Sequence, residues 1–337
     1  HALLRALSLG LLFNSLGAQT TPPSTAPTPA PTAAVRSVKL ADVRLRDACI
    51  LPDPATQTYT LVASERGGGV RAYTSKDLLK WEGPHSIFRT PPNHWPGVAF
   101  RGIWAPELHR YKNKYYLFLT FDTATPYPEQ WRNWRPRVRR ASQVLVGDAP
   151  LGPFKAFAAR PTLPEDMMTL DGTLWEEDGV PYMIYCHEWV QIVDGTVELL
   201  QLAPDLSATV GEPTRLFFGS DAPWAKRNDQ YGCWVTDGPW LHRSKSGKLF
   251  MLWSGFGSGG YTVGLALSDS GKLKGPWRQQ KQPIFADDGG HPMMFQRFDG
   301  QLMLSLHSPN KDTERIRLFE VEDTGETIRI VRPFPAP

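Results

Sequence analysis

Residues 170–190, LDGTLWEEDGVPYMIYCHEWV, predict a β-hairpin that brings two acidic side chains to the same end. The segments TLW and VPYMIYC are rich in β-branched and aromatic residues, and the polar turn 176–179 separates them, so they indicate two antiparallel strands. Asp171 opens this hairpin and Glu188 closes it. Two carboxyl groups in different surroundings can acquire different pKa values and divide the work of acid and base. A surface hairpin with an acidic turn is the alternative interpretation.

The same pattern recurs five times along the chain, and this repeat is the strongest sequence evidence about the fold. Each unit opens on an acidic or histidine residue, followed by a short strand, a polar turn, a strongly apolar second strand and two further strands. The openings are Asp47, Glu107, Asp171, Asp237 and His291. Their spacing of about 54 to 66 residues suits the four-stranded blades of a β-propeller. No helical pattern separates the units, which excludes a parallel βαβ fold.

We therefore predict an all-β domain over residues 37–337, a five-bladed β-propeller with four-stranded antiparallel blades. The innermost strand of every blade starts at the same end of the central channel, so the five openings should ring one funnel. Glu188 and His307 end second strands and should return to the rim of that funnel.

The residues before the propeller carry two other patterns. Residues 1–18 place Arg5 ahead of an apolar run that ends on small residues, which predicts a cleaved signal peptide and a secreted or periplasmic protein, with an uncleaved, lipid-free anchor as the alternative. Residues 19–36 are rich in Pro and Thr and predict an extended linker. No later stretch is apolar over the length that a membrane-spanning helix needs.

Composition excludes some partners. The charge of +3, from 37 basic and 34 acidic residues, and the absence of a basic stripe do not indicate a nucleic-acid partner. A carbohydrate or another small polar ligand fits better. Cys49, Cys186 and Cys233 are widely spaced and form no CxxC pair, so no zinc site is indicated and at most one disulfide can form. We expect a monomer that requires no cofactor.

Five segments carry a family likeness: RDACILPD, WAPELHRYKNKYYLF, LDGTLWEEDGVPYMIYCHEW, VTDGPWLHR and GHPMMF. In this order and at blade spacing they resemble the motifs of glycoside hydrolase family 43, over residues 40–309. The resemblance implies a five-bladed propeller that hydrolyses furanosides or xylosides of polysaccharides with inversion. It allows cleavage of terminal sugars or internal cleavage. The long insertion in blade two favours a closed pocket, and therefore an enzyme that removes terminal sugars, α-L-arabinofuranosidase-like or β-D-galactofuranosidase-like.

The resemblance also implies roles for the acidic residues. Asp47 matches the general base of an Arg-Asp motif, and Asp171 matches the Asp that modulates the pKa of the general acid. Many members carry the acid in a Glu-Gly-Pro motif where this chain has Asp237. We assign the acid to Glu188, which lies in a His-Glu-Trp segment and can be desolvated by the Trp, and keep Asp237 as the alternative. Base and acid of an inverting glycosidase lie about 6.5–9.5 Å apart.

Aromatic and polar residues are candidates for sugar binding. Segment 122–142 is an insertion in blade two, dense in Trp and Arg, and predicts a flap over the substrate, with a solvated basic loop as the alternative. Trp104 could instead pack within its blade. Glu107 could instead form the floor of the funnel. The expected substrate-binding residues are Trp104, Glu107, Trp131, Trp134, Arg140, His187, Trp189 and His307.

His291 and the overall activity each have alternatives. The resemblance implies that His291 lies near an ion at the channel axis, often calcium, contacted directly or through water; a hydrogen-bonded channel histidine is the other reading. A propeller that binds carbohydrate without cleaving it remains open. So does a retaining fructosidase, although such enzymes open on Asn-Asp-Pro-Asn where this chain has Arg46-Asp47-Ala48.

Overall fold

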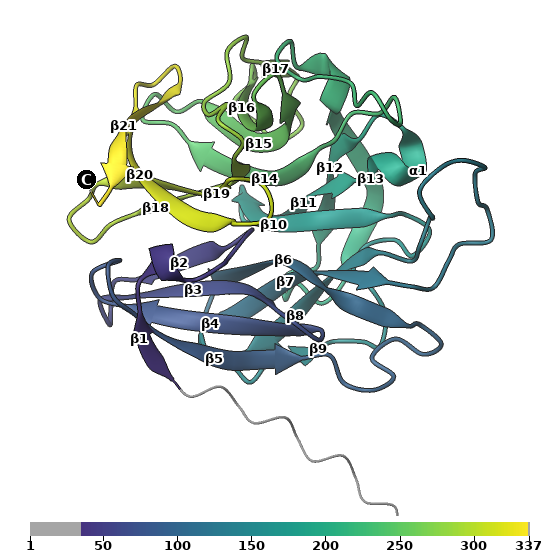
Figure 1. Cartoon of the computed structure of the whole chain (residues 1–337), viewed down its shortest axis with the longest axis horizontal. Helices are drawn as coiled ribbons and strands as arrows, with labels where there is room; N and C mark the ends of the chain where they lie inside the picture. Colours follow the sequence, from purple (N-terminus) through teal and green to yellow (C-terminus); the bar gives the residue numbers. More distant parts are fainter. Residues whose placement is uncertain (1–34, 336–337) are drawn as a thin grey trace, which may run out of the picture. The chain divides into compact units, whose positions relative to one another are not determined.

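The computed structural model describes residues 35–335, which fold into five antiparallel sheets (Figure 1). Each sheet is built from strands that follow one another in the chain. From the innermost strand outward, blade one contains β2 (Cys49–Asp53), β3 (Thr58–Glu65), β4 (Gly69–Ser75), β5 (Trp81–Arg89) and β1 (Arg36–Val38). Blade two contains β6 (Phe100–Tyr111), β7 (Lys114–Thr123), β8 (Ala141–Gly147) and β9 (Lys155–Ala156).

The other three sheets have four strands each. Blade three contains β10 (Thr169–Glu177), β11 (Val180–His187), β12 (Thr196–Leu202) and β13 (Thr209–Phe218). Blade four contains β14 (Asp237–Arg243), β15 (Leu249–Gly257), β16 (Gly260–Ser268) and β17 (Trp277–Gln279). Blade five contains β18 (Gly290–Gln296), β19 (Leu302–Ser308), β20 (Arg315–Asp323) and β21 (Ile328–Phe334).

The five innermost strands form a closed ring. Strand β2 contacts β6, β6 contacts β10, β10 contacts β14, β14 contacts β18, and β18 returns to β2. The predicted five-bladed propeller is thus confirmed, with one correction: blade one has a fifth strand. That strand, β1, pairs with β5 along the outer edge and begins at Arg36, which the sequence pattern had placed in the linker.

Helical structure in the described residues is short: one α-helical turn, α1 (Trp189–Ile192), and two 3₁₀ turns, Leu40–Asp42 and Gly219–Asp221. No helix there is long and apolar enough to cross a membrane. The predicted signal peptide, and the predicted linker up to residue 34, lie outside the described residues.

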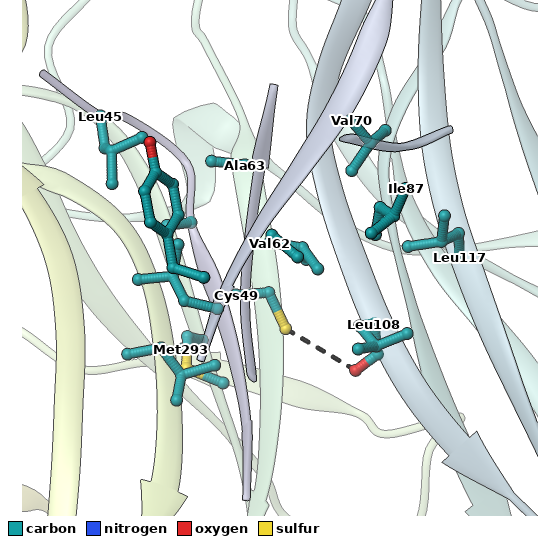
Figure 2. Packing of buried hydrophobic residues seen from close by; sticks show 14 of the residues in the cluster. Leu45, Cys49, Val62, Ala63, Val70, Ile87, Leu108, Leu117 and Met293 are labelled. Carbon is teal, nitrogen blue, oxygen red and sulfur yellow. Dashed lines mark hydrogen bonds between the residues drawn. The ribbon is translucent and has the colours of Figure 1, made fainter. Parts of the chain in front are cut away.

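The hydrophobic core lies between neighbouring blades. Second strands such as β7 and β15 are buried on both faces, which explains their nearly continuous apolar sequences. Figure 2 shows one such layer, where Val62 of blade one packs near Leu117 of blade two. The Cys49 thiol there contacts the Leu108 carbonyl at 3.9 Å. All three cysteines are buried and free, so the single disulfide that the count allowed does not form.

A β-bulge marks the opening of the innermost strands in blades two to five. In blade three, for example, Leu170 pairs with Cys186 and Thr173 with Ile184, so one extra residue is inserted. The first inserted residue adopts a left-handed backbone, and the matching residue before β2 does the same. These residues are Asp47 (φ 49°), Ala105 (φ 40°), Asp171 (φ 56°), Gly238 (φ 49°) and His291 (φ 56°).

This bulge corrects the sequence alignment of the five openings. Asp47, Asp171 and His291 share the left-handed position, which Asp and His tolerate better than most side chains. Asp237 lies one residue before that position, and Glu107 lies two residues after it, on the far side of a proline. The five predicted openings are therefore not equivalent, because spacing along the chain cannot reveal where the bulge falls.

Candidate active site

Hydrogen bonds between adjacent blades hold the left-handed residues in place. The backbone N–H of Asp171 donates to Thr120 Oγ1 at 2.9 Å, and that of His291 donates to Ser254 Oγ at 2.9 Å. The N–H of Asp47 donates to His307 Nδ1 at 3.3 Å. In each case the acceptor belongs to the second strand of the preceding blade, so each blade positions the opening of the next.

Two carboxylates meet around the imidazole of His291. Its Nδ1 lies 3.5 Å from Asp47 Oδ1 and 3.7 Å from Asp171 Oδ2. Arg46 Nε donates to the other oxygen of Asp47 at 3.0 Å. Burial opposes ionisation of Asp47, but His291 and Arg46 outweigh it and hold the pKa of this carboxyl well below its usual range. Asp47 is therefore ionised at neutral pH.

Asp171 and Asp237 have the opposite electrostatic character. Burial, followed by the charge of Asp47, raises the pKa of Asp171 well above its usual value. Burial, followed by the charge of Asp171, raises the pKa of Asp237 to about 7. Asp171 is 5% exposed, whereas Asp237 is half-buried and accepts a 3.0 Å hydrogen bond from Tyr261 Oη. Three carboxyls with unlike proton affinities thus lie together at one end of the channel.

Glu188 is placed differently from Asp237. Its buried carboxylate forms an ion pair with Arg140. Arg140 also donates to Asp122 Oδ1 from Nε at 3.1 Å and from Nη2 at 2.7 Å. Burial raises the pKa of Glu188, and the charge of Arg140 opposes this effect. The guanidinium lies 3.9 Å from the ring centre of Trp104, a side chain that is 39% exposed, so the predicted packing role of Trp104 is not seen.

The predicted flap is docked on blade three. Trp134 Nε1 donates to the Val190 carbonyl of α1 at 2.7 Å, and Arg137 Nη2 donates to the Gln191 carbonyl at 2.6 Å. These bonds hold the insertion against the residues that follow Glu188. Two contacts thus anchor the insertion, whereas its residues 128–133 are exposed to solvent, and its role as a flap over the substrate stays a prediction.

The flap and its neighbours form an aromatic patch. Trp131 lies 5.6 Å from Trp134, which lies 5.7 Å from Trp189, and Trp189 lies 5.3 Å from Tyr231, measured between ring centres. Trp131 is 38% exposed. Tyr231 was missed by sequence reasoning because it lies in a loop outside the repeat pattern. Flat aromatic faces of this kind can stack on the apolar face of a sugar.

Two predicted substrate-binding residues are not brought into the carboxyl cluster. His187 contacts Gln191 Oε1 at 2.9 Å and Glu198 Oε1 at 3.3 Å. Glu107 is buried, and its Oε2 contacts His109 Nε2 at 2.7 Å, which suits the alternative role at the funnel floor. Their contact with sugar stays a prediction.

His307 does belong to the cluster, with Tyr261 beside it. The His307 ring is fully buried, and the Tyr261 ring stacks on it at 5.5 Å. Tyr261 also bonds to Asp237, so it links the two sides of the cluster. Sequence reasoning missed Tyr261, although its place directly after the SGFGSGG turn, opposite a blade opening, was a usable signal.

The surroundings of His291 do not resemble a direct metal site. Its Nδ1 faces two carboxylate oxygens, and no group of three or more His, Cys, Asp or Glu side chains within residues 35–335 has a metal-binding arrangement. Calcium prefers six to eight oxygen ligands. A water-mediated calcium ion at the axis stays a prediction.

Comparison with known families bears on this geometry. The model of glycosyl hydrolases family 43 matches residues 42–331, nearly the whole propeller. This chain belongs to glycosyl hydrolase family 43. The protein is therefore a glycoside hydrolase. This match confirms the family resemblance of the five sequence motifs. Neither the non-catalytic propeller nor the fructosidase alternative is supported.

Three individual proteins show how similar this family 43 hydrolase is to known relatives. The endo-arabinase from Bacteroides thetaiotaomicron VPI-5482 is 35% identical, with a TM-score of 0.74 over 89% of this chain and 98% of that one. Alpha-L-arabinofuranosidase B of Pyricularia oryzae is 27% identical over 197 residues, which is 57% of this chain but only 37% of that protein. The alpha-L-arabinofuranosidase from Lactobacillus brevis shares the fold, at 18% identity and a TM-score of 0.66 over 89% of this chain and 98% of that one.

Proposed function

We propose that this protein is a secreted, inverting glycoside hydrolase that removes terminal α-L-arabinofuranosyl residues. The observation that carries the proposal is the opposite pKa shift of Asp47 and Asp237, two half-buried carboxyls beside the same buried Asp171. Acid–base hydrolysis of a glycoside requires one ionised and one protonated carboxyl at the same pH, and inversion is proposed from the family resemblance. The composition of residues 1–18 supports secretion.

Asp47 is proposed as the general base. Its pKa lies well below the usual range, so it is ionised, and its Oδ1 lies 3.1 Å from His307 Nδ1 and 3.5 Å from His291 Nδ1. The ionised carboxylate can accept the proton of a water that attacks the anomeric carbon. Arg46 donates to the side chain of Asp47, and the backbone N–H of Asp47 donates to His307. These two bonds hold the carboxylate in one orientation.

Asp237 is proposed as the general acid, in place of the Glu188 favoured by sequence. A carboxyl with a pKa of about 7 holds its proton at the pH where Asp47 is ionised, and it can protonate the leaving glycosidic oxygen. A proton on Glu188 would instead break its buried ion pair with Arg140. Asp171 then acts as the modulator, because it lies beside Asp237 and adds to the effect of burial on the pKa of Asp237.

Glu188 and Arg140 are proposed to support substrate binding. Arg140 is clamped between Glu188 and Asp122, and it lies against one face of Trp104. This arrangement fixes the indole ring, whose other face can stack on a sugar. Arabinofuranose is the first substrate to test because the relatives are named arabinofuranosidase and endo-arabinase. Galactofuranose and xylose are the next candidates.

Hydrolysis of a panel of 4-nitrophenyl glycosides tests the substrate. The panel contains α-L-arabinofuranoside, β-D-galactofuranoside and β-D-xyloside, and the arabinofuranoside should be cleaved fastest. Proton NMR of the first-formed sugar should show the β-anomer, and appearance of the α-anomer would refute inversion. Linear arabinan should yield arabinose alone, whereas a ladder of oligosaccharides would show internal cleavage.

A further inference from the structure

A second concave surface adjoins the carboxyl cluster and lies between blades one and two. It is a cleft of about 780 Å³, lined by the segment before Asp47, by the β3–β4 turn and by the start of β6. Arg46, which bonds to Asp47, and Trp104, which stacks on Arg140, both line it. The cleft is therefore continuous with the proposed site.

Arginines dominate this cleft. The five that line it are Arg44, Arg46, Arg66, Arg71 and Arg101, against three carboxylates, Asp42, Glu65 and Glu314. A neutral sugar chain does not require such a surface. Guanidinium groups bind carboxylates through paired, charge-assisted hydrogen bonds.

Most of these charges already have partners within the protein. Arg44 pairs with Glu314 at 2.5 Å, and Arg101 pairs with Asp122 at 3.1 Å. Arg46 pairs with Asp47, and Glu65 pairs with an arginine outside the cleft. The pairing leaves two guanidiniums, Arg66 and Arg71, and one carboxylate, Asp42, without an ion pair in the described residues.

Arg71 gives the cleft a specific donor. Its Nη2 donates to the Arg44 carbonyl at 3.1 Å, which fixes the plane of the guanidinium. Its Nε is buried and has no hydrogen-bond acceptor within residues 35–335. That nitrogen lies beneath the surface of the cleft, so the donor left for a ligand is Nη1 of the same guanidinium, which forms no hydrogen bond in the described residues. Arg66 is exposed on the β3–β4 turn of the same cleft and forms no hydrogen bond or ion pair there.

We infer that this cleft binds a sugar carboxylate, so that the preferred substrate is an acidic polysaccharide carrying uronic acid near the cleaved arabinose. This inference rests on the proposed hydrolase activity and specifies its substrate class. The uronate carboxylate accepts from Arg71 and Arg66, while the neutral terminal sugar lies at Asp47 and Asp237. The cleft thereby selects for the part of the substrate that is not cleaved.

The test compares one substrate in two forms, a glucuronate-bearing arabino-oligosaccharide and the same oligosaccharide after carboxyl reduction. The quantity measured is the ratio of kcat/KM for the acidic and reduced forms. We expect the wild-type protein to prefer the acidic form about tenfold, the effect of one charge-assisted hydrogen bond. This preference should shrink in 1 M NaCl, because salt screens exposed charges.

Substitutions of single arginines show which residues cause the preference for the acidic form. Arg66→Gln and Arg71→Gln should each lose most of the preference and keep kcat/KM for the reduced form, and Arg71→Lys should recover part of it. Arg278→Gln, an exposed arginine on β17 of blade four, is the matched control and should behave as wild type. Should Arg71→Gln fail to fold, Arg66→Gln alone decides the outcome, since the exposed Arg66 side chain forms no hydrogen bond or ion pair within residues 35–335.

Two negative outcomes are distinguishable. Equal turnover of the acidic and reduced forms by the wild type overturns the inference and leaves the proposed hydrolase intact. Turnover of neither form overturns the proposed activity. Calorimetric Kd values for the same two oligosaccharides then show whether the cleft binds the carboxylate. A stronger preference for a sulfated than for a carboxylated oligosaccharide would also overturn the assignment to uronate.

Discussion

Replacing Asp237 with Asn should change stability and catalysis in ways that depend on pH. Burial and the charge of Asp171 raise the pKa of Asp237 from 3.8 to about 7. The folded protein therefore keeps a proton that the unfolded chain releases, and folding loses stability as pH rises between these two values. A difference of this size corresponds to at most about 4 kcal/mol. Because Asp237 is half-exposed and coupled to Asp171, we expect about 2 kcal/mol.

Asn has the shape of Asp but no charge, so Asp237→Asn should abolish this penalty. The variant should match the wild type in free energy of unfolding at pH 4 and exceed it by about 2 kcal/mol at pH 8.5. Urea denaturation at both pH values measures the difference. Asp229→Asn changes an exposed loop carboxyl without hydrogen bonds or ion pairs in the described residues, and it serves as the control. A stability difference that is equal at both pH values would refute the raised pKa.

The same variant tests the general acid. An acid is needed least when the leaving group is already good, so Asp237→Asn should impair natural arabino-oligosaccharides by about 10²–10⁴-fold and nitrophenyl glycosides far less. Its alkaline limb, expected near pH 7 in the wild type, should flatten. Glu188→Gln should impair both substrates alike. The reverse pattern, with a leaving-group-dependent defect in Glu188→Gln, would return the acid to Glu188.

Three other substitutions probe the cluster. Asp47→Asn should lower kcat about 10³-fold while circular dichroism shows an unchanged fold, and near-normal kcat would contradict its role as base. Gly238→Ala places a methyl group 2.9 Å from Cγ and Nδ1 of His291, so it should reduce both stability and kcat. Gly247 also has a positive φ but has open space around it, so Gly247→Ala should reduce stability only. Arg140→Met leaves the buried Glu188 carboxylate without its cation and leaves Asp122 with Arg101 alone, so it should destabilise the fold by about 3 kcal/mol; an unchanged free energy of unfolding in urea denaturation would argue against the ion pair.

The number of blades and the end of the channel that carries the acids could be predicted from the sequence, because each apolar second strand is preceded by a polar opening. The residue that occupies the bulge could not be predicted from charge. The dipeptides Ala-Pro, Asp-Gly, Gly-Pro and His-Pro mark it in blades two to five, since the first member takes the left-handed conformation. Alignment on these dipeptides would have separated Glu107 and Asp237 from Asp47.

The preference for Glu188 over Asp237 shows a second limit. His-Glu-Trp suggested a carboxyl desolvated by an indole, yet the cation that faces Glu188 is Arg140, 48 positions earlier in the chain. A pKa depends on such long-range neighbours and not on adjacent residues. Arg66 and Arg71 were missed for the same reason, since only the packing of blade one against blade two brings them beside Trp104.

Within residues 35–335 no sheet contains strands from both ends of the chain, so no strand pairing there joins the first blade to the last. That junction depends on contacts outside the ladders, including the backbone hydrogen bond from Leu45 to Glu314, the Arg44–Glu314 pair and the bond from Asp47 to His307, which lies 260 positions away. Asp47 therefore reaches its working position only after blade five has folded. Catalytic competence should be the last property to appear during folding and the first to vanish when the junction opens, so loss of turnover in mild denaturant should precede loss of β-sheet signal.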